Sequence, residues 1–506
     1  MPFQDANSQI EPLLFQMKQY KNLTKSTIEI LPSSGQTDYG PHRRCIFTLP
    51  YASLISLEDL AFKFEFVPVS PELAPATTGT SAPVYRVLPP KDVASLIAEV
   101  DIKINGQTIQ HLTRYNDIVN LLNFFERPKT AKLALQGFNP EITQQRDTNG
   151  LYTKITNTTY DFMGTAPVKP MNVPKKYIIN HWYGLLGHRG KEVSSNFIDT
   201  NMLGEITIAF VFATPSVCIA SKGTQVQVQT QGGQPVTPAV KVASGNPGAT
   251  TAAQDAIIDT YDRAVAEPTS YIIRNPKMSM VRYNLPTAYS EAVRSHLSNG
   301  SPYQIAFNHY EIHSQNANAS DGNIRWNENS RDIKGLLAFF TNNARDTNTG
   351  SDYDQPILTS KYFKYDNPIH ERSQFQIGSV KMPQNELDTI DCFLELIRGV
   401  PGARGNNQDF DLGRGVAGET IEMFIEHCFM AYLSLEWSEG MTERALEGKK
   451  LLSGLSSEQL PISCSYYYNN DMTFKGTYAW DKTLNVMSLT TRLLVIENGQ
   501  NVHVEI

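Results

Sequence analysis

The sequence predicts an all-β protein that is built from two tandem domains of similar size. The chain has 506 residues, well above the roughly 250–300 residues at which a single hydrophobic core stops growing. Many short segments alternate apolar and polar residues with the period of two that is typical of strands. Helical patterns are few, so the regular strand–helix alternation of a parallel sheet is missing. These observations favour antiparallel sheets in both halves.

Ten segments carry the strand pattern, and Phe62, Phe64 and Phe66 in AFKFEFV are its clearest example. The ten predicted strands are Cys45–Leu49, Leu60–Val67, Val100–Ile104, Ile206–Phe212, Ser279–Tyr283, Gln304–Ile312, Leu336–Phe340, Ser373–Ile377, Ser463–Tyr468 and Val486–Ile496.

Two segments carry a helical pattern of apolar residues, Tyr115–Glu126 and Asn385–Arg398. Pro128 ends the first of them, because proline cannot continue a helix. We expect Asn385 to be the N-cap of the second and Gly399 to close it.

The clearest change in composition lies at Ser221–Ala253, which contains no aromatic and no acidic residue and is rich in Gly, Gln, Thr and Pro. Such a segment buries too little apolar area to offset its ordering entropy, so we expect an exposed linker. A short helical pattern around Ile257 and Tyr261 follows it. The sequence thus predicts an N-terminal arm (1–23), a first domain (24–220), a linker (221–259) and a second domain (260–506).

The two halves also repeat each other. Leu57, Leu60 and Phe64 match Ile333, Leu336 and Phe340 at one constant offset, and a strand-turn-helix unit follows in each half. Each half then ends in an apolar strand, LGEITIAFVFA in the first and TLNVMSLTTRLLVIENG in the second. This order favours an internal duplication over a chance likeness between β-rich sequences.

Composition excludes several classes of protein. Hydrophobic residues make up 41% and charged residues 19% of the chain, which excludes a wholly disordered chain or a coiled coil. The formal net charge is -7, so no basic surface for nucleic acid dominates. No apolar run reaches the roughly 18 residues of a membrane helix, and the beginning of the chain lacks the pattern of a signal peptide. We therefore expect a soluble protein that is not secreted.

The five cysteines are scattered and none belongs to a C-x-x-C pair, which argues against a disulfide framework and a thiolate zinc site. Their mostly apolar neighbours predict buried thiols in a reducing compartment. The five are Cys45, Cys218, Cys392, Cys428 and Cys464.

The best metal candidate is HYEIH, since His309, Glu311 and His313 would share one face of a strand. Side chains on one face of a strand are about 6.6–7 Å apart, which is awkward for three ligands. An ordinary polar strand face is therefore favoured.

The other candidates for chemistry have simpler explanations. The G-x-G-x-x-G match at Gly413, Gly415 and Gly418 follows a polar loop where a dinucleotide site needs a strand. His427 and Cys428 would point in different directions on a helix, so they would not form a nucleophile–base pair. Asp352 and Asp354 could bind a cation, but a solvated loop is favoured. The basic residues form only pairs, which do not make a phosphate-binding groove: Arg43–Arg44, Lys175–Lys176 and Lys449–Lys450. We predict no catalytic, cofactor-binding or metal-binding residue, and no enzyme.

The order of these segments resembles one family. The segments are CIFTLPYASLISLEDLAFKFEF, DIKINGQTIQHLTRYNDIVNLLNFF and NFIDTNMLGEITIAFVFA in the first half, and YQIAFNHYEIHSQ, NENSRDIKGLLAFF, FQIGSVKMPQNELDTIDCFLELIRG and LNVMSLTTRLLVIENG in the second. Over most of 24–506 they resemble the double jelly-roll major capsid proteins of tailless icosahedral DNA viruses, the lineage that includes adenoviruses, virophages and polinton-like viruses.

The resemblance implies two eight-stranded antiparallel jelly rolls and a homotrimer whose six rolls form a pseudo-hexagonal block of a virion shell. The implied partners are neighbouring capsomers and minor capsid or penton proteins, with an internal membrane as a further option. The resemblance implies no cofactor, and the net charge argues against direct sequence-specific binding of nucleic acid. The amphipathic pattern Ile10, Leu13, Leu14, Met17 and Tyr20 would pack on its own domain, or reach a neighbouring subunit or the membrane.

Two other classes stay open at this point. One is a two-domain β-sandwich that binds a receptor or a carbohydrate, as adhesins and lectins do. The other is an enzyme on a pair of cupin-like barrels, which would need a histidine-rich metal set in each half. Only the second half contains such a set, HYEIH.

Overall fold

The computed structural model describes most of the predicted β-rich segments. The residues that it describes are 24–51, 53–69, 83–90, 92–126, 143–146, 152–156, 174–187, 197–224, 230–231, 234–235, 259–260, 270–284, 291, 295, 303–317, 319–342, 370–399, 430–435, 456, 460–468, 482–497 and 501–505. The predicted N-terminal arm, the glycine match at 413–418, the acids at 352 and 354, and the pair at 427–428 lie outside these residues.

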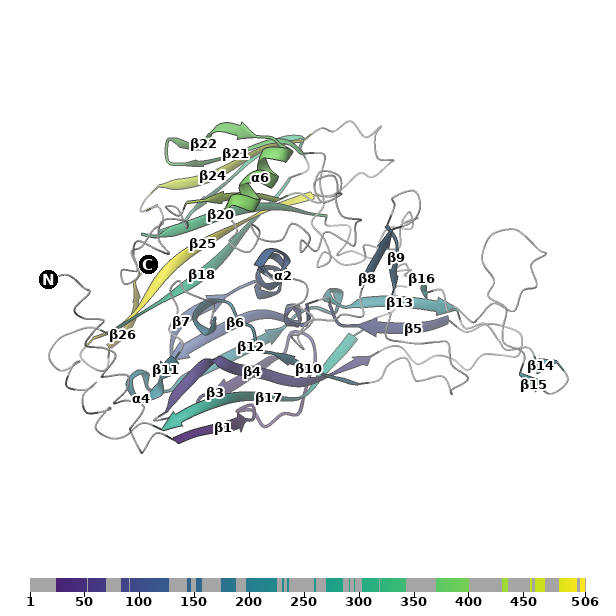
Figure 1. Ribbon diagram of the computed structural model, residues 1–506, viewed down its shortest axis with the longest axis vertical. Helices are drawn as coiled ribbons and strands as arrows, with labels where there is room; N and C mark the ends of the chain where they lie inside the picture. Colours follow the sequence, from purple (N-terminus) through teal and green to yellow (C-terminus); the bar gives the residue numbers. More distant parts are fainter. Residues whose placement is uncertain are drawn as a thin grey trace, which may run out of the picture.

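The N-terminal unit, which we call roll 1, contains two antiparallel sheets (Figure 1). The first has the order β1 (Thr24–Ile30), β17 (Ser270–Asn284), β4 (Leu54–Val69) and β10 (Lys175–Ile179), with β2 (Asp38–Tyr39) beside β17 and β11 (Phe197–Asp199) beside β4. The second has the order β3 (Arg44–Thr48), β12 (Ile206–Phe212), β6 (Ile97–Ile104) and β7 (Gln107–Leu112).

Aromatic side chains from both sheets fill the interior of roll 1. Phe62 of β4 is fully buried, and its ring lies 5.9 Å from that of Phe47 and 5.2 Å from that of Phe210. Trp182 stacks on Phe210 at 5.2 Å. The period of two in AFKFEFV therefore places its phenylalanines in the core while Lys63 and Glu65 face away from it.

The C-terminal unit, roll 2, repeats this plan. Its first sheet has the order β18 (Tyr303–Asn316), β25 (Lys482–Glu497), β20 (Ile333–Asn342) and β23 (Met430–Ser434), with β26 (Asn501–Glu505) beside β25. Its second sheet has the order β19 (Asp321–Asn327), β24 (Pro461–Tyr468), β21 (His370–Ile377) and β22 (Val380–Leu387). Phe340 of β20 meets Tyr466 and Tyr468 of β24 edge-on at 5.5 and 6.2 Å.

The strand order is identical in the two rolls. If the eight main strands of each roll are numbered along the chain, one sheet has the order 1-8-3-6 and the other 2-7-4-5, and every pairing is antiparallel. This is the eight-stranded jelly-roll topology, so the predicted fold class is confirmed. All ten predicted strands are present, and three matched pairs of the duplication lie in equivalent strands, β4 and β20.

Two details of the predicted organisation need correction. Strand β17 lies beyond residue 260, yet it pairs with β4 and β1 along its length, so its hydrogen bonds place it in roll 1. The apolar strand β12, matched to β25 from the sequence, is the seventh strand of roll 1, whereas β25 is the eighth of roll 2. The counterpart of β25 is therefore β17.

Part of the predicted linker also forms strands. β13 (Ile219–Thr224) pairs with β5 (Pro83–Leu88) and with β16 (Asp259–Thr260), and β16 lies within the segment that the sequence predicts as a short helix. Two small hairpins complete the described strands: β14 (Thr230–Gln231) with β15 (Gln234–Pro235), and β8 (Thr143–Arg146) with β9 (Tyr152–Thr156).

Among the described residues, each roll has one long helix between its fifth and sixth strands. Helix α2 (Tyr115–Glu126) has its predicted bounds, and α6 is Thr389–Gly399. Asn385 is not the N-cap of α6, because β22 continues its pairing to Leu387; Asp388 Oδ1 accepts the hydrogen bond from the Asp391 amide at 2.7 Å. The shorter helical turns are η1 (Val93–Leu96), η2 (Gly184–Leu186), α4 (Thr200–Leu203) and η3 (Pro215–Val217).

A hairpin turn precedes α2 in roll 1. Asn105 and Gly106 join β6 to β7, and their φ angles are 51° and 82°. Two successive positive φ angles fit the right-handed twist of the flanking strands, which is why an Asn-Gly pair is favoured there. The predicted strand-turn-helix unit is therefore a strand-turn-strand-helix unit, with the polar strand β7 in between.

Candidate functional site: the surfaces and seam of the two rolls

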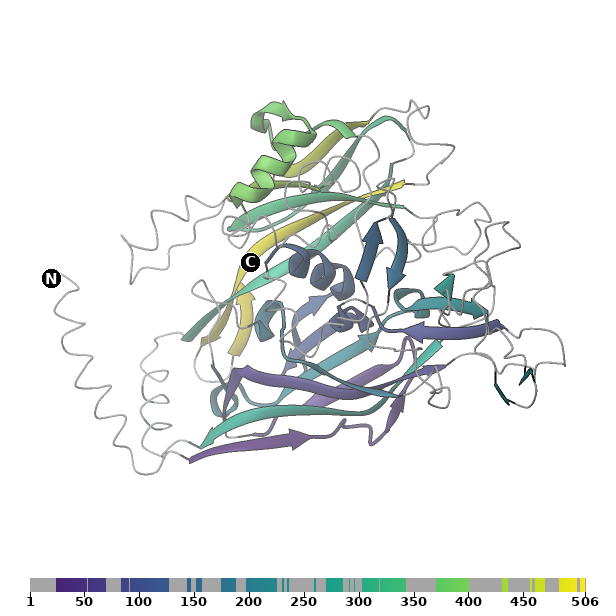
Figure 2. The same cartoon turned by 45° about the vertical axis from the view of Figure 1, so that its right-hand side comes forward.

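The contact between the two rolls, which we call the seam, is continuous with the core. One hydrophobic cluster includes roll 1 side chains such as Leu186 and roll 2 side chains such as Phe307, Tyr310 and Phe339. Tyr183 and Tyr310 meet edge-on across the seam at 5.9 Å. The turn η2 contacts β18, and Figure 1 and Figure 2 show α2 beside the strands β18 and β25. The two rolls therefore form one packed body.

Gln110 of β7 is the central polar residue of the seam and is 1% exposed. Its Nε2 donates to the Asn308 carbonyl of roll 2 at 3.0 Å and lies 3.3 Å from His309 Nδ1, while its Oε1 accepts from the Leu185 amide at 2.7 Å. The side-chain amide thus satisfies buried groups of both rolls at once.

Arg114, just before α2, forms a second polar link across the seam. Its Nη2 donates to Asn485 Oδ1 at 3.0 Å, and its Nη1 donates to Ser314 Oγ. Its Nε donates to Asp117 Oδ2 at 2.7 Å within roll 1. The residue directly before α2 is therefore held by both rolls.

His309 of HYEIH is a seam residue and not part of a metal triad. It is 5% exposed, and burial together with the charge of Arg492 lowers its pKa to about 3. The imidazole is consequently neutral over the physiological range of pH.

Glu311 and His313, the other two metal candidates of HYEIH, lie close to Glu328, a residue that the sequence did not indicate. Donor atoms of Glu311, His313 and Glu328 all lie within 4.8 Å of one another. Burial alone would raise the pKa of Glu328, but its interactions with His313, Ser488 and Arg492 outweigh burial and lower it. An acid directly after an alternating strand, in RWNEN, was the only sequence signal for this residue.

Four of the five cysteines fall in the described part of the chain, and all four are free and buried, as predicted. Burial raises the pKa of Cys45 and Cys392 to about 12, and it raises those of Cys218 and Cys464 as well. A nucleophilic cysteine needs the thiolate, so these side chains serve as small apolar groups of the core.

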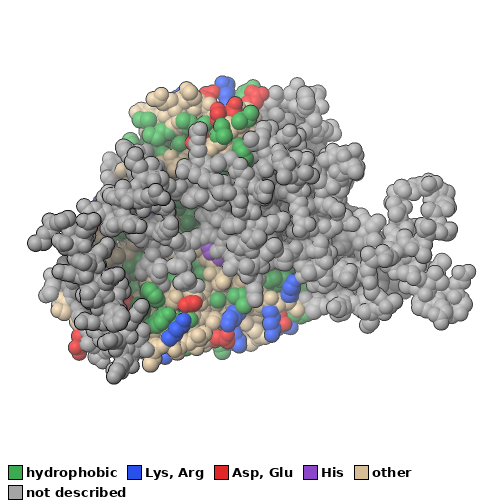
Figure 3. Space-filling model, viewed as in Figure 1, with side chains coloured by type: hydrophobic (Ala, Val, Ile, Leu, Met, Phe, Trp, Pro, Cys, Tyr) green, Lys and Arg blue, Asp and Glu red, His purple; other side chains and the backbone are tan. Residues whose placement is uncertain are grey.

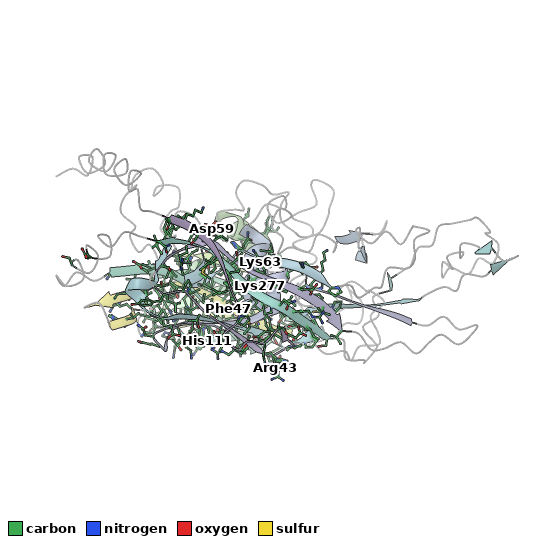
Figure 4. All side chains as sticks on the ribbon, turned by 90° about the horizontal axis from the view of Figure 1, so that it is seen from below. Arg43, Phe47, Asp59, Lys63, His111 and Lys277 are labelled. Carbon is green, nitrogen blue, oxygen red and sulfur yellow. The ribbon has the colours of Figure 1, made fainter. Side chains whose placement is uncertain are left out.

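Charges on the outer faces of roll 1 are mixed in sign. Glu29 lies 2.8 Å from Lys63 Nζ and 3.6 Å from Lys277 Nζ on one sheet. On the other sheet, Asp101 is paired with Arg44 and lies 3.8 Å from Lys103 Nζ. Figure 4 shows Lys63 and Lys277 together on one side, His111 and Arg43 on the other, and Phe47 between the layers. The predicted basic pair at 43–44 is thus partly neutralised by an acid.

Large exposed apolar side chains occur on both rolls: Leu31 and Tyr51 of roll 1 are each 67% exposed, and those of roll 2 include residues of α6 and β22. Ile390 and Leu394, one helical turn apart on α6, are 50% and 39% exposed, and Val380 on β22 is 52% exposed. Figure 3 shows green side chains at the top of the molecule, where Figure 1 places α6. Within the described residues, no helix has the length and apolar character needed to cross a bilayer.

Neither the comparison with protein-family models nor that with curated proteins finds a match. Solved structures do match. A chain of the PBCV-1 virus capsid is 11% identical and has a TM-score of 0.52; the match covers 96% of this chain and 98% of that one. PBCV-1 VP54, in a crystal structure fitted into a reconstruction of the virophage Sputnik, is 12% identical with a TM-score of 0.50 over 96% and 98% of the two chains. The fold is therefore that of viral capsid proteins along nearly the whole chain.

Proposed function

We propose that this protein is the major capsid protein of an icosahedral virus, and that it assembles as pseudo-hexagonal homotrimers into the virion shell. The observation that carries the proposal is the fold shared with a viral capsid chain over 96% of this chain. The match also extends over 98% of that capsid chain, and the role that we propose is structural.

The duplicated fold supports this kind of assembly. Two rolls with one strand order present similar outlines, so three copies arranged in a ring supply six similar blocks. Such a ring contains two kinds of contact, which alternate. One joins roll 1 to roll 2 within a subunit, and the other joins roll 2 of one subunit to roll 1 of the next. The exposed Ile390 and Leu394 of α6 would be covered by that next copy, since obligate contacts are more apolar than ordinary surface.

The partners follow from the same role. They are further copies of the trimer, minor capsid and penton proteins, and an internal membrane where the virus has one. A net charge of -7 disfavours direct neutralisation of the genome, which would need many lysine and arginine contacts to phosphate. The protein would be made inside the host cell and would reside in the virion.

Electron microscopy of the purified full-length protein tests the proposal. We expect particles with a hexagonal outline and threefold symmetry that tile into sheets or shells as the concentration rises. A glycan array on the same sample tests the rival class. Single two-lobed particles that bind a glycan would overturn the capsid proposal and support a receptor-binding protein.

A further inference from the structure

Glu311, His313 and Glu328 form a cluster, which we call the carboxylate–histidine cluster, in the interior of roll 2. Glu311 and His313 are two residues apart on β18, so both side chains lie on the same face of the sheet. The residue opposite His313 is Val486, a fully buried member of the core between the two sheets of roll 2. The cluster therefore lies on the inner face of this sheet.

Glu328 comes to the cluster from a different element, since it directly follows β19 of the opposite sheet. It is 4% exposed, and its Oε2 accepts a hydrogen bond from Ser488 Oγ at 2.5 Å. Ser488 is the cross-strand partner of Glu311. The three potential ligands thus connect the two sheets of roll 2.

Three buried polar atoms here have no hydrogen-bond partner, and one of them is Arg492 Nε. His313 Nε2 is the second; it lies 3.8 Å from Glu328 Oε2, beyond hydrogen-bonding distance. The Thr490 hydroxyl is the third; this side chain is 1% exposed and lies two residues from Ser488, on the same face of β25. Buried polar groups are almost always satisfied, and an ion is one of the usual reasons when protein partners are missing.

The local charge also favours a cation. Glu311 and Glu328 bring two carboxylates, and Arg492 brings one guanidinium that interacts with both. These two carboxylates and one guanidinium together carry a net charge of about -1. A divalent cation would compensate this charge in a poorly solvated place.

We propose that the carboxylate–histidine cluster binds a divalent transition-metal ion of the zinc class, with one nitrogen ligand from His313 and oxygen ligands from Glu311 and Glu328. One nitrogen with two carboxylates suits zinc better than calcium or magnesium, which prefer oxygen ligands alone. A water that hydrogen bonds to Thr490 completes the four ligands. The ion ties β18, which contacts roll 1, to the opposite sheet of roll 2.

The test is a titration of the full-length protein, without a histidine tag and stripped of metal, with zinc chloride in a calorimeter. We expect one zinc ion per chain and a higher midpoint of thermal unfolding when zinc is present. His313→Gln and Glu311→Gln should each weaken zinc binding by at least about tenfold. Circular dichroism verifies that both variants are folded, and Glu311 is only half-buried, so its amide variant is the safer of the two.

The matched control is His503→Gln. His503 Nε2 also lies 3.8 Å from a glutamate oxygen, that of Glu505, but both side chains are 40% exposed. This variant should bind zinc as the unaltered protein does. Absence of zinc binding by the unaltered protein, or equal binding by His313→Gln and Glu311→Gln, would overturn the proposal.

Discussion

The two long helices occupy the same place in the strand order of their rolls, yet their apolar faces differ in exposure. In α2, Ile118, Val119 and Leu121 are at most 1% exposed. In α6, Phe393 and Leu396 are buried to a similar degree, whereas Ile390 and Leu394 are 50% and 39% exposed. Over the side chains that the structure describes (115–122 in α2), the same local design therefore gives a covered apolar face in roll 1 and a partly uncovered one in roll 2.

The neighbourhood of each helix explains the difference. Arg114, directly before α2, binds Ser314 and Asn485 of roll 2, so α2 adjoins the seam (Figure 1). Roll 2 has no third roll of its own chain beside it. In the proposed ring, roll 1 of the next copy takes that place, and the exposed side chains of α6 mark the contact.

Truncation of the buried side of α6 should have the largest effect. Phe393→Ala removes a ring that is 3% exposed, and we expect a loss of about 3–5 kcal/mol in the free energy of unfolding. Leu394→Ala, one residue along on the exposed side, should cost less than about 1 kcal/mol in the isolated chain. Urea unfolding measures both, and equal losses would show that the two faces of α6 do not differ.

Removal of the seam amide should have the next largest effect. Gln110→Leu leaves the Leu185 amide and the Asn308 carbonyl without their partner, at a cost of about 2–3 kcal/mol. The exposed Gln107 on the same strand is the matched control, and Gln107→Leu should change stability by less than about 0.5 kcal/mol. An unaltered unfolding midpoint for Gln110→Leu would mean that the rolls do not depend on this link.

Acid should lower the free energy of unfolding through the protonation of two buried histidines. Burial lowers the pKa of His309, at the seam, and of His370, in roll 2, to about 3 each. The unfolded chain then binds more protons than the folded one, so stability is complete above about pH 6.5 and falls toward pH 3 by about 1.4 kcal/mol per pH unit for each histidine.

Single variants separate the two contributions. The two histidines contribute equally to the slope of the free energy of unfolding against pH. His309→Gln and His370→Gln should therefore each remove half of this joint contribution. Urea midpoints between pH 7 and pH 4.5 measure the slope. A slope that neither variant changes would contradict the burial of neutral imidazoles.

Local pattern predicted much of the fold. The alternation in β4 and the apolar run of β12 have strong signals because one or both faces of these strands are buried. The polar strands β7 and β22 were missed, since most residues of β22 are exposed and carry no apolar period. The seam residue Gln110 was missed for a related reason, because a buried polar side chain on a polar strand has no sequence signature.

Long-range pairing was the main source of error. β17 returns to β4 and β1 only after the chain has left roll 1 at β12 and passed through β13, and no local period encodes that return. No local pattern brings Glu328 to Glu311 and His313 either, because they meet only where two sheets pack together. Both features depend on which strands pair, and pairing follows from the tertiary fold.

The central claim is that a second copy of the chain covers the exposed side of α6. Mass photometry of the unaltered protein beside the double variant Ile390→Asp and Leu394→Asp tests it most directly, since two buried charges at an apolar contact are strongly unfavourable. We expect a trimer for the unaltered protein and a folded monomer for the double variant. A trimer of undiminished stability in the double variant, or a monomer in both, would contradict the account.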